Sequence, residues 1–173
     1  MLNYFLTLIL LSNLSSHVSK TLITDESVKP ISICELLENR KLYNGKMVAV
    51  VGIFSAGYHG AWLVDNCEQK IKTGDYVWSS SLWLEYDDSL PSVSTKGLSV
   101  DTMAAIEKAK ERKQHIDSRK WGSRWVVVYG RFETYEELQT YTPSNGKTIY
   151  ELGFGHLNSS PGQLVYNYIK KAR

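Results

Sequence analysis

The stretch "KMVAVVGIFSAGYHGAWLVD", residues 46–65, decides the fold predicted for this chain. Apolar and β-branched residues lie on both sides of the short turn "GYHG", which predicts two strands joined as a hairpin. Gly52 stands inside the first strand, where a glycine marks a bulge or a sharp bend. The segment "RWVVVYGRFETY", residues 124–135, repeats the Val-x-Gly-x-Phe pattern of that strand. We do not attribute the repeat to a duplicated domain. Each of the two strands needs a glycine at the point where a small barrel bends.

Two further segments favour strands, "SLWLEYD" at residues 81–87 and "GQLVYNYI" at residues 162–169. A helix is predicted between the third and fourth strands, with Ser99 as its N-cap. Five strands with a helix between the third and the fourth is the element order of the OB-fold, a small Greek-key barrel. The predicted class is therefore a mainly β, OB-like five-stranded barrel. Another small β-barrel or a split β-sandwich is the alternative.

The N-terminal sequence favours export. An apolar segment runs from Tyr4 to Leu11, which suits a signal peptide and falls short of the ~20 residues that span a bilayer. We predict a signal peptide over residues 1–19, a linker over 20–30 and a single OB-like domain over 31–173. The predicted location is the periplasm or the outside of the cell. The alternative is a chain tethered to the membrane by an uncleaved N-terminal segment.

The composition is that of an ordinary single globular domain, with 173 residues, 43% hydrophobic and 22% charged. The basic run at residues 108–120 is interpreted as a solvated helix face. Because the formal net charge is only +2, nucleic acid is not an expected partner.

The segment "KPISICELLENRKLYNGK", residues 29–46, predicts a short helix. Ser32 and Glu35 have the spacing of a capping box. Cys34 falls in the first turn, and Cys67 is the one other cysteine of the chain. An even number of cysteines in an exported chain favours a disulfide, which would staple this helix onto the following hairpin. Two buried thiols, or metal ligation by Cys67, are the alternatives.

Five short motifs carry a resemblance to a known family. The chain is similar to a family of uncharacterised exported bacterial proteins with an OB-like domain, over most of its mature length. The resemblance implies a fold and an export route, and very little about function. The insertions at residues 68–81 and 87–122 match no motif of the family. The motifs are "CELL" (34–37), "VVGIF" (50–54), "HGAWLVDNC" (59–67), "VYGRFE" (128–133) and "GHLNSSPGQLVY" (155–166).

The two loops that flank the ligand face of an OB-fold each contain a histidine next to glycine. One loop joins the first two strands and the other joins the last two, so we expect His59 and His156 to lie at the same end of the barrel. The candidate ligand-binding residues are those of the two loops and the neighbouring aromatic strand positions: Tyr58, His59, Trp62, Trp83, His156 and Asn158.

Three hypotheses compete for these residues. In the first, the histidines only hydrogen-bond the loop backbone. In the second, they join the tryptophans in a platform for sugar rings or bases. In the third, His59 and His156 bind zinc with Asp65 or Glu151 in a metal-dependent hydrolase; the sequence contains neither H-E-x-x-H nor another close ligand pair.

Other catalytic templates are not met. The chain lacks G-x-S-x-G and the phosphate-binding G-x-x-x-x-G-K-[ST] motif. Arg131 and Glu133 are interpreted as a surface pair. We therefore predict no catalytic residue and no cofactor, and an exported binding or structural module whose unidentified ligand is a carbohydrate or a protein.

The aromatic residues are divided between the surface and the core. Those expected to be exposed are Trp62, Trp78, Trp83, Tyr141 and Tyr150. Those expected in the core are Phe54, Trp125 and Phe132.

Overall fold

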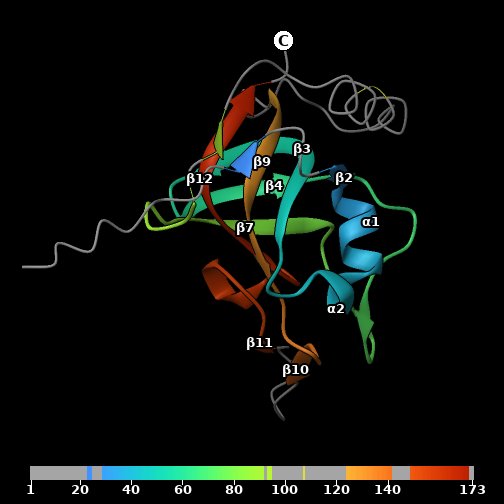
Figure 1. The fold of residues 1–173 in the computed structure, drawn as a ribbon. Coiled ribbons are helices and arrows are strands. Elements are labelled where there is room, and N and C mark those ends of the chain that lie inside the picture. The colour runs from blue at the N-terminus through green and yellow to red at the C-terminus, as the bar shows by residue number, and fades with distance from the viewer. Residues whose placement is uncertain are drawn as a thin grey trace, which may run out of the picture.

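The fold is built on a six-stranded mixed sheet, seen in a computed structural model that describes residues 23–24, 29–91, 93–94, 107, 124–141 and 149–171. The strands follow the order β2-β3-β4-β7-β12-β9, and β9 also pairs with β3. Hydrogen bonds therefore run in a ring through β3, β4, β7, β12 and β9 (Figure 1). The strands are β2 (Pro30–Ser32), β3 (Met47–Gly57), β4 (Gly60–Val64), β7 (Ser81–Tyr86), β9 (Arg124–Glu133) and β12 (Gln163–Lys171).

The five predicted strands are confirmed as the members of this ring. Neighbours pair antiparallel except for β7 and β12, which are parallel. The sixth strand, β2, was not predicted and pairs parallel with β3. Three residues are too few to carry the alternation that identifies a strand in a sequence.

Two-stranded pairings supplement the sheet. β1 (Ile23–Thr24) pairs with β8 (Val93–Ser94) and lies within the segment expected to be a linker. The polar composition of residues 68–81 predicts a loop, but β5 (Lys72–Thr73) and β6 (Tyr76–Val77) form a hairpin within this segment. β10 (Gln139–Tyr141) pairs with β11 (Ile149–Leu152), followed by the short 3₁₀ helix η2 (His156–Asn158).

The predicted N-terminal helix is confirmed as α1 (Ile33–Glu38), followed by α2 (Arg40–Tyr43). The Ser32 hydroxyl accepts a hydrogen bond of 3.1 Å from the amide of Glu35, as the capping pattern predicts. The helix predicted from Ser99 lies outside the described residues except for Glu107, as do the basic run and the predicted signal peptide. Among the helices that the structure describes, none is long and apolar enough to cross a membrane.

A disulfide joins Cys34 in the first turn of α1 to Cys67, just beyond β4, with their Cα atoms 5.3 Å apart. The predicted pairing is confirmed. It holds the apolar face of α1 against the ring, where Ile33 and Leu36 join one core cluster with residues of the strands. Phe132 is fully buried in that core, whereas Phe54 and Trp125 are half-buried.

The two glycines of the repeated Val-x-Gly-x-Phe pattern are required by close contacts. A Cβ on Gly52 would lie 2.7 Å from atoms of Ile33 and Leu63, and β3 has no register shift against β9 there, so of the two predicted features, a bulge or a sharp bend, the bulge is absent. A Cβ on Gly130 would overlap the backbone of β12 at Val165. This contact lies beside the register shift that follows Tyr166 in β12, so here the glycine does accompany an irregularity.

Candidate binding face

The first loop of the predicted site is a two-residue hairpin turn. β3 ends at Gly57 and β4 begins at Gly60, which leaves Tyr58 and His59 at the tip. Gly60 has φ of +141°, a backbone angle that other residues rarely adopt. Tyr58 is 100% exposed and presents its edge to the ring of His59, with ring centroids 5.4 Å apart. The hairpin thus carries two aromatic rings into solvent.

The second loop, between β11 and β12, is short, closed and strained. The amides of Phe154 and Ser160 donate to each other's carbonyls at 2.9 and 3.1 Å, which closes the loop at its base. Leu157 and Asn158 have φ of 57° and 51°, a left-handed conformation that costs on the order of 1–3 kcal/mol per residue unless its surroundings impose it. This backbone holds the apolar side chain of Leu157 outward, 70% exposed.

The two loops meet through their histidines. The rings of His59 and His156 stack with centroids 4.1 Å apart and an interplanar angle of 12°. Both side chains are exposed. The structure thus brings together two residues that lie far apart in the chain, as the expected positions of the loops predict. We name the surface formed by Tyr58, His59, His156 and Leu157 the histidine tip.

The imidazoles contribute stacking and not backbone hydrogen bonds. Neither ring donates to or accepts from any residue that the structure describes. The hydroxyl of Ser159 donates a hydrogen bond of 3.1 Å to the carbonyl of His156. This bond holds the loop backbone without involving the imidazole ring. The hypothesis that the histidines pin the loop backbone therefore lacks a supporting contact.

Trp83 supports both loops. Gly60 and Gly155 approach its indole so closely that a Cβ on either glycine would overlap the ring. Its Nε1 donates to Glu85 at 3.1 Å, which holds the indole in place. Sequence reasoning missed this role, although the glycines next to both histidines, in "GYHG" and "GFGH", were a signal that both loops approach something bulky.

The predicted tryptophan platform is not flat. Trp62 and Trp83 are directly opposed across β4 and β7, but their rings meet edge to face, 5.2 Å apart at 82°. The glycines that pack on Trp83 also cover part of its indole. Asn158, the remaining candidate, is half-buried, and its amide donates to Gly155 within the loop at 3.1 Å.

No family model, curated protein or solved structure matches this chain.

A third metal ligand is missing from the part of the tip that the structure describes. Asp65 follows the last residue of β4 while His59 precedes the first, so the five-residue strand separates them by roughly 15–20 Å. Asp65 is buried there and accepts from the amide of Asn66 at 2.8 Å. The side chain of Glu151 lies outside the described part. Among described side chains, no cluster of three or more His, Cys, Asp or Glu could hold a metal ion.

The other residues singled out in the sequence lie outside the histidine tip. Arg131 and Glu133 form a surface ion pair of 2.9 Å, as expected, and Gln163 donates to the same carboxylate at 2.6 Å. Trp78, expected to be exposed, is buried with 1% of its surface accessible; its Nε1 donates to Thr73 of β5 at 2.9 Å, and Gly153 packs closely against its ring. The side chains of Tyr141 and Tyr150 lie outside the described residues.

Proposed function

We propose that this chain is an exported, non-enzymatic module with an OB-like barrel, and that it binds a protein partner through the histidine tip. The observation that carries the proposal is the tip itself. Two distant loops meet there through stacked histidines, and a fully exposed Tyr58 and a 70% exposed Leu157 flank the stack.

The strand order supports the OB-like Greek key. In a Greek key, three consecutive strands are followed by a long connection to a fourth, which returns beside the first. The order β9-β3-β4-β7 fits that description, and the connection from β7 to β9 is long. In OB barrels the ligand face lies over the second and third strands, between the loops that carry His59 and His156 here. This correspondence supports the proposal that the tip binds a ligand.

Two observations support export. The disulfide is the state expected in an oxidising compartment. The N-terminal sequence has the length and polarity of a signal peptide.

The exposed side chains favour a protein partner over a carbohydrate. Sugar rings stack on flat aromatic faces, whereas Trp62 and Trp83 meet edge to face and Trp83 is covered in part. Tyrosine is enriched in protein interfaces, and an apolar side chain held outward by a strained backbone gains free energy when a partner covers it. Leu157 is such a side chain.

Photo-crosslinking in the native host tests the proposal. Benzoylphenylalanine replaces Tyr58 in one variant and Leu42 in a matched control. Leu42 is 61% exposed and belongs to α2, which contributes no residue to the histidine tip. We expect irradiation to yield a discrete protein adduct from position 58 and none of that mass from position 42.

The same adduct from both positions, or no adduct from position 58, contradicts a protein-binding tip. A glycan array with the purified chain distinguishes the competing hypothesis. Glycan binding that is lost in Trp62→Ala, together with an absence of adducts, would assign the face to carbohydrate.

A further inference from the structure

The stack of His59 and His156 joins two side chains of the residue type that gains a proton close to neutral pH. Histidine is the residue whose ordinary pKa, about 6.5, lies between about pH 5 and 8. The ring centroids are 4.1 Å apart and both side chains are exposed, so each ring exchanges protons with solvent. The same surface therefore exists in an uncharged state and in a state that carries two positive charges.

Neither loop contains a charged residue that would offset a second proton. Residues 55–62 and 153–162 include no Asp, Glu, Lys or Arg. Tyr58 presents its edge to His59, and a phenol carries no charge at neutral or acidic pH. Among the residues that the structure describes, none forms an ion pair with either imidazole. Protonation of both rings therefore places two like charges face to face.

The carboxylates described on the neighbouring strands are held in other contacts. Glu85 of β7 accepts a hydrogen bond of 3.1 Å from Trp83 Nε1, so its carboxylate lies at the indole. On β9, Glu133 forms its ion pair with Arg131. The side chain of Glu151 in β11 lies outside the described part of the chain. These described carboxylates are therefore engaged away from the imidazoles.

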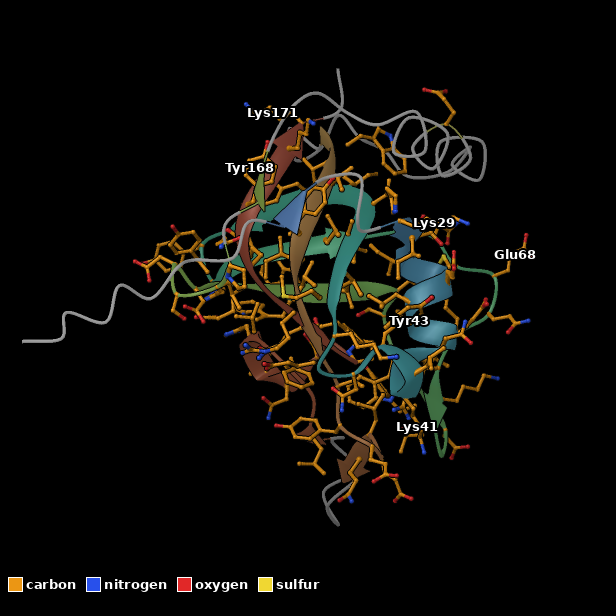
Figure 2. The ribbon with its side chains drawn as sticks, in the orientation of Figure 1. Lys29, Lys41, Tyr43, Glu68, Tyr168 and Lys171 are labelled. Atoms are coloured by element: carbon orange, nitrogen blue, oxygen red, sulfur yellow. A yellow bond between two sulfur atoms is a disulfide. The ribbon has the colours of Figure 1, made fainter. Side chains whose placement is uncertain are left out.

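The lysines labelled in Figure 2 come from other parts of the chain. Lys29 precedes β2, Lys41 belongs to α2 and Lys171 ends β12. None of them belongs to the two loops of the tip. Within those loops, the two histidines are therefore the source of any positive charge.

Repulsion between two such charges is large enough to open the stack. Two unit charges about 4 Å apart repel in water by about the amount that the stacking of two aromatic rings contributes. The backbone does not oppose separation of the rings. Phe154 and Ser160 hold the base of one loop, and Gly57 pairs with Gly60 at the base of the other. Both imidazoles therefore separate by rotation of their side chains while the loops keep their shape.

We propose that the histidine tip is a pH-sensitive switch, with stacked, uncharged rings above the range of histidine titration and separated, positively charged rings below it. The consequence for a partner rests on the proposed function. A protein that covers Leu157 and the stack buries an uncharged surface at the higher pH. Burial of two charges without counter-charges is costly, so the partner is expected to dissociate in acid.

Ring-to-ring nuclear Overhauser contacts, measured in the purified chain at about pH 8 and about pH 5, test the switch. The cross-peaks between His59 and His156 are expected to weaken at least about threefold at the lower pH, because repulsion separates the rings. Cross-strand contacts between Phe154 and Ser160 should persist at both pH values, which distinguishes separation of the rings from unfolding of the loop.

His156→Phe is the matched control. It keeps a flat ring at position 156 and removes one of the two charges, so contacts between positions 59 and 156 should have similar intensities at both pH values. The position is exposed, so the variant is expected to fold. Four results would overturn the proposal: wild-type contacts that persist at the lower pH, no contact at the higher pH, equal weakening in the variant, or a simultaneous loss of the Phe154–Ser160 contacts.

Crosslinking from position 58 tests the consequence for a partner separately. With the host suspended in buffer of about pH 7.5 or about pH 5.5, the adduct yield is expected to fall at least about fivefold at the lower pH. Equal yields at both pH values would contradict release in acid. No adduct at either pH would contradict the protein-binding tip, whereas the ring contacts of the purified chain report on the switch without any partner.

Discussion

Removal of the Cys34–Cys67 disulfide is expected to lower the free energy of unfolding by about 3–4 kcal/mol. The bridge joins residues 33 apart in the sequence, and in the chain-entropy model a closed loop of that length restricts the unfolded chain by this amount. The loss is a large fraction of the 5–15 kcal/mol by which domains are usually stable. Urea unfolding of the oxidised chain and of the Cys34→Ala, Cys67→Ala double variant measures it.

The reduced wild-type chain is the control for this experiment. If the covalent link carries the stability, reduction and double substitution should lower the unfolding midpoint to a similar extent. A loss below about 1 kcal/mol in both would mean that the buried face of α1, with Ile33, Leu36 and Leu37, holds the helix in place without the link.

Gly130→Ala is expected to cost about 3 kcal/mol, at the upper end of the range for overpacking. Gly130 pairs with Val48 on one side and Tyr166 on the other, in the strand that closes the ring. A new Cβ there would overlap the carbonyl of Val165, and backbone in a sheet moves aside less readily than the end of a side chain. The added methyl would push β9 and β12 apart. Thermal or urea unfolding detects the loss.

Gly57→Ala provides the matched control. Gly57 lies at the end of β3, has no positive φ, and a Cβ there would come no closer than 3.6 Å to Trp62, an ordinary contact. We expect a change within about 0.5 kcal/mol. Equal losses in the two variants would contradict this explanation, because a Cβ on Gly57 makes only an ordinary contact and does not approach the backbone of β12.

Much of the sheet could be predicted because its signals are local. The strands around Val50 and Val128 are rich in β-branched residues, and the two residues between Gly57 and Gly60 predict a hairpin. The capping pair of Ser32 and Glu35 predicts α1. The need for Gly130 was also visible, but the atoms that impose it belong to β12 and could not be identified from the sequence.

The elements that sequence reasoning missed depend on distant partners. β2 is a strand because β3 offers it an edge, and the buried indole of Trp78 packs against Gly153, which is distant in the sequence. At the site, the order of strands was enough to expect His59 and His156 at one end. The support from Trp83 required the positions of Gly60 and Gly155 in space. The ligand-binding role of the tip stays a prediction.

Nuclear Overhauser contacts between the rings of His59 and His156 test whether the fold joins the two distant loops into one face. Labelling the four histidines and assigning them by single substitution to glutamine makes the rings observable. We predict ring-to-ring cross-peaks in the wild type. They should weaken or vanish in Gly155→Ala, where a Cβ would collide with Trp83 at a φ of +75°. Assigned rings with no cross-peak in the wild type would contradict the shared face.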